Sequence, residues 1–180
     1  ADIVSGLEVP FCPNDRAYAW HGMDKESPLA TTVIVEYGAP FPSAHGSGMG
    51  FRAAAIGNDR FPEDYRWPGG EDRAFCYLLQ RRGAVLVSVP TAICHYRLRD
   101  NYLGTLKQRF WWGHGAALLR RDFPDLVPAR PLIIVAKTWV AAFLDLIRLH
   151  DRTRYTWAPI RIAGLVGRVA GSLRLRVWAL

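Results

Sequence analysis

Strand-like and helix-like hydrophobic patterns alternate along this chain, and the alternation constrains its fold more than any other feature. β-Rich runs cover residues 1–10 and 30–38, and proline and glycine bound the second run. A helical pattern follows over 72–82, and a short apolar strand is expected over 84–90. A strand–helix–strand order of this kind predicts an α/β domain.

Three further elements are expected around this alternation. A short helical turn is predicted at Phe51–Ile56, and an extended run over 92–98. Asp100 is expected to cap a second helix, because its carboxylate can accept hydrogen bonds from the backbone N–H groups of the first turn. The apolar face of that helix is predicted to contain Leu103, Leu106, Phe110 and Ala117.

The positive charge is concentrated near the C-terminus. The chain of 180 residues has a net charge of +7. Residues 1–130 carry 15 basic and 14 acidic side chains, whereas residues 131–180 carry eight basic and two acidic ones. A nucleic-acid-binding domain usually has a basic face in its folded part, so a nearly neutral 1–130 segment argues against nucleic acid as a partner. We therefore expect a domain over 1–130 and a basic tail over 131–180.

Cysteine usage and the N-terminal residues indicate the cytoplasm. Cys12, Cys76 and Cys94 are odd in number and have no C-x-x-C spacing, which argues against a disulfide framework or a zinc knuckle. The first residues lack the basic and apolar segments of a signal peptide. A reducing compartment is therefore expected.

Two adjacent carboxylates, Glu71 and Asp72, follow a pair of glycines in "WPGGEDRAF" (67–75), at the predicted start of a helix. Acidic residues at this position interact favourably with the helix dipole and the free N–H groups, so both can be simple caps. An ionised carboxylate can also accept a proton from a hydroxyl group as a general base. The pair alone does not decide between these two roles.

The order of four segments resembles the C-terminal half of family-2 glycosyltransferases, which have the GT-A fold. These segments are "GSGMGFR" (46–52), "GGED" (69–72), "AVLVSVP" (84–90) and "AICHYR" (92–97). The resemblance covers roughly residues 1–125 and depends on the whole order, since each motif alone is weak. It implies an inverting transferase that moves a sugar from a nucleotide-sugar donor to an acceptor.

The resemblance also implies roles for individual residues. Asp72 would be the catalytic base and Glu71 would help to bind the acceptor. His95 would join a divalent metal ion, Mn or Mg. The segment 108–112 resembles a degenerate Gln-x-x-Arg-Trp element of processive synthases, in which Arg109 follows Gln108 directly and Trp111 stands where the motif has arginine. Donor-sugar and acceptor binding is thus expected from Gly46, Ser47, Gly48, Met49, Gly69, Gly70, Arg109 and Trp112.

One departure from the family pattern is large. The nucleotide-binding half of these enzymes ends in Asp-x-Asp, and no Asp-x-Asp occurs in this sequence. We therefore expect the chain to be a fragment of a longer enzyme. A degenerate, non-catalytic relative that binds membrane surfaces is the alternative.

The basic tail is predicted to contain two amphipathic helices, over 131–150 and 160–172. The first helix is not expected to span a membrane, because it carries Lys137, Asp145 and Arg148. Each central charge costs about 2.5–3.5 kcal/mol on insertion. Arg161 and Arg168 are expected on one side of the second helix. Such helices often lie in an anionic membrane interface, so we expect a peripheral protein at the cytoplasmic face and a lipid-linked or cell-surface glycan acceptor. Packing against other protein is the alternative.

Overall fold

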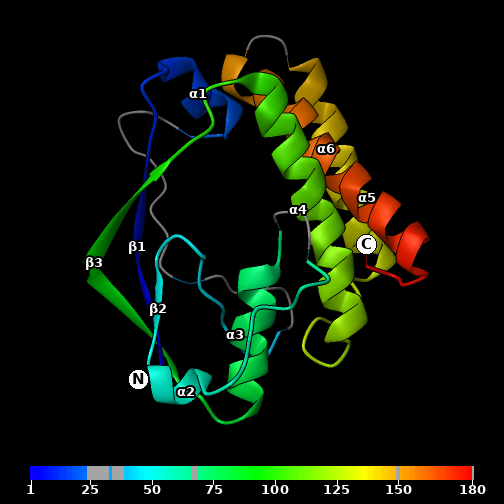
Figure 1. Ribbon diagram of the computed structural model, residues 1–180. Coiled ribbons are helices and arrows are strands. Elements are labelled where there is room, and N and C mark those ends of the chain that lie inside the picture. Colours follow the sequence, from blue (N-terminus) through cyan, green and yellow to red (C-terminus); the bar gives the residue numbers. More distant parts are fainter. Residues whose placement is uncertain (24–32, 34–38, 66–68, 149–150, 180) are drawn as a thin grey trace.

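The computed structural model describes residues 1–23, 33, 39–65, 69–148 and 151–179, without the side chains of 152–154. In this part of the chain it has a mixed α/β architecture, with a three-stranded sheet and six helices (Figure 1). The predicted α/β class is therefore confirmed. The strand predicted over 30–38 lies, apart from Val33, outside the described residues.

The sheet has the order β2-β1-β3 and mixes both strand directions. β1 (Ile3–Phe11) pairs antiparallel with β2 (Met49–Phe51) and parallel with β3 (Leu86–Arg97). The register of β1 and β3 shifts after Gly6, where a Cβ would lie 2.4 Å from the Ala92 carbonyl oxygen. Only glycine fits this irregularity.

Two details of the sheet differ from the sequence prediction. The segments 84–90 and 92–98 were expected to be separate, but β3 runs through both as one strand. Pro90 causes no break, because the register shift lies at the same place and removes residues 90–92 from the ladder. β2 lies within the segment "GSGMGFR" (46–52), for which no strand was expected, and its three residues are too few to show a strand pattern.

Helix α3 (Glu71–Arg81) lies between the sheet and α4 (Tyr102–Asp122), as Figure 1 shows. Phe75 and Leu79 pack toward Ile3 of the sheet, and Tyr77 packs toward the C-terminal half of α4. Because helix α3 is covered on both sides, it is mostly buried, and its predicted position is confirmed. The short helix α2 (Ala53–Ile56) lies within the predicted turn at Phe51–Ile56.

The start of α4 differs from the prediction by one residue. Asn101, and not Asp100, is the N-cap, and its Oδ1 accepts from the Gly104 N–H at 2.6 Å. Asp100 instead forms an ion pair with Arg97 at 3.5 Å. The expected apolar face is also wrong at its first position, because Leu103 is 71% exposed. The helix is buried through small and polar residues in its middle and through Leu118 and Leu119, which pack with Tyr77 of α3.

Helices α5 (Leu132–Ile147) and α6 (Arg152–Leu175) follow, and α6 packs along α4. Backbone contact at glycines explains the close approach. A Cβ at Gly113 would lie 2.0 Å from the Gly164 carbonyl oxygen, and one at Gly167 would lie 1.9 Å from that of Phe110. The short helix α1 (Asp15–Trp20) also contacts α6. Helix α6 thus packs on the preceding helices and α5 packs on α6, while a domain boundary near residue 130 stays a prediction.

Helix α5 exposes its apolar side. Asp145 is buried and forms ion pairs with Arg161 of α6 and, at 3.3 Å, with Arg148. The polar residues of α5 therefore do not share one environment: Lys137 is exposed, and Asp145 is buried toward α6. The large exposed side chains of α5 are Leu132, Ile133, Val140, Phe143, Leu144 and Ile147. Among the residues that the structure describes, no helix is both long and apolar enough to cross a membrane.

Candidate functional site

A cavity of about 420 Å³ opens between the sheet, the start of α3 and the middle of α4. It brings together six residues that the sequence singled out from three separate segments. The segment before β2 supplies two of them, the start of α3 two and α4 two. These residues are Gly46, Ser47, Glu71, Asp72, Arg109 and Trp112.

The Gly69–Gly70 turn sets the position of the two carboxylates. Both glycines have positive φ, +142° and +101°, which residues with a Cβ rarely adopt. The turn also presses on α4: a Cβ at Gly69 would lie 2.8 Å from the Trp112 Cα, and a Cβ at Gly115 would lie 1.6 Å from the Gly69 carbonyl oxygen. The two glycines thus hold α3 against α4, and neither is among the described residues that line the cavity.

Glu71 and Asp72 accept hydrogen bonds from different parts of the backbone. Glu71 Oε2 accepts from the Gly69 N–H at 2.7 Å and so closes the glycine turn. Asp72 Oδ2 accepts from the Gly46 N–H at 3.0 Å, and its Oδ1 accepts from the Arg73 N–H at 2.8 Å. Asp72 therefore joins the start of α3 to residues 46–52, called the glycine-rich segment below. A carboxylate has about four lone-pair sites, so these bonds leave it able to accept from a ligand.

The other expected members of the glycine-rich segment lie beside the cavity and are not among the described residues that line it. Gly48 packs closely on β1, where a Cβ would lie 3.2 Å from the Glu8 Cγ. Met49 begins β2 and packs against the core between the sheet and α3. Both residues shape the sheet edge that carries Gly46 and Ser47.

Sequence reasoning missed a polar group at the end of β1. Glu8 lines the cavity, and the Ser47 hydroxyl donates to its Oε1. His45 Nδ1 lies 3.8 Å from Glu8 Oε2. A signal was present, because Glu8 is the one charged residue in the apolar run from Ile3 to Phe11.

His21 is a second missed residue, and its environment keeps it neutral. It lines the cavity and is 6% exposed. Burial and the nearby positive charge of Arg109 lower the pKa of His21 to about 4. Its Nε2 has no hydrogen-bond partner among the described residues. A neutral imidazole with one unsatisfied nitrogen can bind a ligand hydroxyl.

Arg109 is held between two aromatic rings. Its guanidinium carbon lies 4.6 Å from the ring centre of Trp112 and 4.7 Å from that of Trp157 on α6. Burial lowers the pKa of Arg109 to about 10, so the side chain remains a cation at neutral pH. Its Nε has no hydrogen-bond partner among the described residues. The cavity that contains the carboxylate of Asp72 thus also has a fixed positive charge.

The expected metal ligand, His95, lies apart from this cavity. Successive side chains of a strand point to opposite faces, and Tyr96, the next residue, lines the cavity. His95 is exposed and touches the edge of the Phe11 ring. In the described part of the chain, no three His, Cys, Asp or Glu side chains are grouped as metal ligands. His95 is therefore not among the described residues of this cavity, and a metal ion bound through it stays a prediction.

Comparison of the chain with protein-family models, curated proteins and solved structures gave no match. The functional conclusion consequently depends on the residues that meet in the cavity.

Proposed function

We propose that the chain is the C-terminal part of an inverting GT-A glycosyltransferase. It would transfer a sugar from a nucleotide-sugar donor to a lipid-linked or cell-surface glycan acceptor. One observation carries the proposal: Asp72, the Gly46–Ser47 backbone and the Arg109–Trp112 pair line one cavity, although the sequence separates them widely.

In the proposed reaction, Asp72 accepts the proton of the acceptor hydroxyl. The hydroxyl oxygen forms a bond to the anomeric carbon of the donor sugar, and the bond between that carbon and the diphosphate breaks. The electron pair leaves with the nucleoside diphosphate, and attack from the opposite side inverts the anomeric centre. Arg109 would stabilise the negative charge of the leaving diphosphate. Glu71 would keep the turn that orients Asp72, since it accepts from the Gly69 N–H.

The divalent metal that the resemblance implies has no step in this scheme. His95 points away from the cavity, and the sequence contains no Asp-x-Asp. In this proposal the described residues would bind the acceptor, and the nucleotide-binding residues would come from elsewhere in a longer enzyme.

A second candidate function is a non-catalytic module that binds a membrane surface. The exposed apolar side of α5 favours it, because contiguous apolar surface often marks an interaction site. The two proposals share a location, peripheral at the cytoplasmic face of a membrane. They differ in whether Asp72 has a chemical role.

Turnover by an Asp72→Asn variant tests the transferase. The assay needs the longest product of the reading frame that contains this chain, supplied with nucleotide sugars and lipid-linked acceptors. We expect turnover to fall about 10²- to 10⁴-fold, the usual contribution of a positioned base, with donor binding nearly unchanged.

Asp125→Asn is the matched control, because this carboxylate is exposed and pairs with Arg81 on the surface. Its turnover should equal that of the wild type. Thermal unfolding of both variants separates chemistry from stability. Normal turnover by the Asp72→Asn variant would show that Asp72 has no catalytic role, and the membrane-binding module would then be the better proposal.

A further inference from the structure

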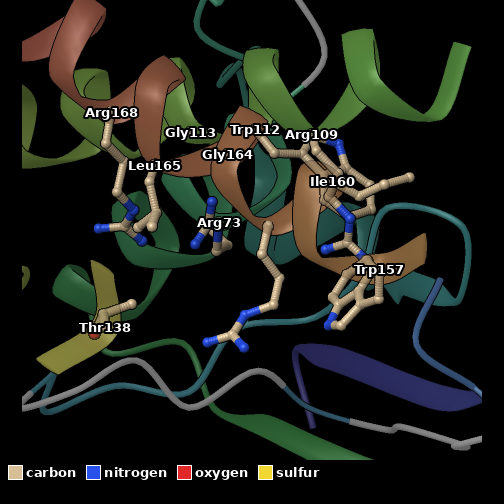
Figure 2. Close-up of a pocket in the computed structure, with 11 residues that line it drawn as sticks. Arg73, Arg109, Trp112, Gly113, Thr138, Trp157, Ile160, Gly164, Leu165 and Arg168 are labelled. Carbon is tan, nitrogen blue, oxygen red and sulfur yellow. The ribbon is translucent and has the colours of Figure 1, made fainter. Parts of the chain in front are cut away.

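A second cavity, of about 290 Å³, lies between α3, α4, α5 and α6 (Figure 2). Four arginines from three helices line it, together with Thr138 of α5, and no carboxylate is among the described residues of its lining. We infer that this cavity binds a phosphate or diphosphate group. The four arginines are Arg73 of α3, Arg109 of α4, and Arg161 and Arg168 of α6.

The lining of this cavity favours an anion, because it holds four arginines and, among its described residues, no carboxylate. Asp145 offsets one positive charge through its ion pair with Arg161, but it also pairs with Arg148. Arg168 also donates to the Ala179 carbonyl oxygen. Several cations that share one cavity repel each other, and a bound anion would relieve this repulsion.

Arg109 provides independent support. It is held by tryptophan rings on two sides, and these supply no hydrogen-bond acceptor in the plane of the guanidinium. Its buried Nε has no hydrogen-bond partner among the described residues. A buried polar group without a partner is costly, so it indicates a ligand that supplies one.

Phosphate fits this lining by chemistry and by size. Guanidinium groups bind phosphate oxygens through paired N–H donors, and arginine is favoured wherever phosphate is recognised. The cavity has roughly ten times the ~30 Å³ that one water occupies in the liquid, which is enough room for a phosphate or diphosphate group.

Arg109 and Trp112 line both this cavity and the one that contains Asp72. A phosphorylated molecule bound at the arginines would therefore extend toward Asp72. If the proposed transfer reaction is correct, this molecule is the acceptor, and the arginines hold its phosphorylated end. That assignment rests on the proposed function, whereas anion binding itself does not.

Calorimetric titration of the 180-residue chain with inorganic diphosphate tests the site. We expect saturable binding that weakens as salt rises. Arg168→Gln should weaken it about tenfold. The double variant Arg161→Gln/Asp145→Asn should do the same, and it leaves no buried carboxylate without its partner. Arg174→Gln is the matched control, since Arg174 is exposed on the same helix, outside the lining, and should bind as the wild type does.

Circular dichroism melting confirms that each variant is folded. The inference is overturned if diphosphate does not bind, or if folded cavity variants bind it as well as the Arg174→Gln control does. Asp72→Asn should retain diphosphate binding. The two proposals can therefore be rejected separately. Absence of diphosphate binding by the wild type would reject the anion site, and unchanged turnover by the Asp72→Asn variant would reject the transferase.

Vesicles separate the two sources of phosphate. Phosphatidylcholine vesicles with and without phosphatidic acid present a phosphate monoester on a lipid. If phosphatidic acid increases binding, and Arg168→Gln but not Arg174→Gln abolishes the increase, the site takes a lipid phosphate. If diphosphate binds but phosphatidic acid adds nothing, the site takes a soluble phosphate. Either outcome supports the anion site.

Discussion

At the scale of single residues, the two adjacent carboxylates have different structural partners. Glu71 binds the turn immediately before it, and Asp72 binds the glycine-rich segment 26 residues away. Helix capping and catalysis are therefore compatible roles for this pair. The sequence predicted that the two acids matter, but the bond between Asp72 and Gly46 depends on tertiary packing that no local pattern contains.

The buried His21 makes a prediction about pH. Its pKa is lowered from 6.5 to about 4, so between these values the unfolded chain binds more protons than the folded chain. The free energy of unfolding should therefore fall as pH drops through this range, by about 1.4 kcal/mol per pH unit and about 3 kcal/mol in all from this residue. Urea unfolding at pH 7 and near pH 4 measures the loss.

His21→Gln should remove this part of the acid sensitivity. His95→Gln is the matched control, because His95 is exposed on β3, and it should keep the full loss. Equal acid sensitivity of His21→Gln and the wild type would show that other groups cause it.

At the scale of helices and strands, success depended on how local the signal was. Helix α3 was predicted well because its apolar spacing and Gly83 lie within a short stretch. β3 was expected as two segments, because proline normally ends a strand. Pro90 is accommodated only because the register of β1 and β3 shifts after Gly6, which leaves Pro90 outside the ladder. The buried face of α4 was also missed. Thr105 and Gln108 are buried there by neighbours that the helix itself does not specify.

The glycine contacts between α4 and α6 make a prediction about stability. In Gly167→Ala the new Cβ would lie 1.9 Å from the Phe110 carbonyl oxygen, so the helices must separate. We expect the free energy of unfolding to fall by about 1–3 kcal/mol, the usual cost of overpacking. Urea unfolding measures this change.

Gly164→Ala is a matched control on the same helix. Its Cβ would lie 3.5 Å from the carbonyl oxygen of Arg109 on α4, which is an ordinary van der Waals contact. Alanine favours the helix by up to about 1 kcal/mol over glycine, so this variant should be as stable as the wild type or more stable. Similar losses in both variants would mean that backbone contact does not limit the packing of α6.

At the scale of the whole molecule, the main surprise is the orientation of the C-terminal helices. The sequence predicted two amphipathic helices in this region, and α5 and α6 are both present. Arg161 and Arg168, expected to be a polar face of the tail, line a cavity instead. Apart from Lys137, the side of α5 that remains exposed is apolar, and Asp145 is turned toward α6.

This apolar side makes a prediction about membrane binding. If it lies in a membrane interface, replacing Val140, Phe143 and Ile147 with serine should remove most of the binding to vesicles, since each apolar side chain contributes about 1.5–3 kcal/mol on burial. Co-sedimentation with anionic vesicles measures the effect. Exchange of exposed apolar residues elsewhere, such as Val87 of β3 and Val85 just before it, should have little effect. Undiminished binding by the α5 variant would place the membrane contact on another surface.

The position of Arg109 in the lining of both cavities has a thermodynamic consequence. A single guanidinium charge serves both spaces, so a negatively charged ligand on one side screens it from a ligand on the other. The two ligands should therefore weaken each other, and linkage requires the same factor in both directions. A reaction that releases a diphosphate on one side of Arg109 would thereby weaken binding of the phosphorylated product on the other side. The same coupling free energy would then set both the release of that product and its inhibition of the reaction.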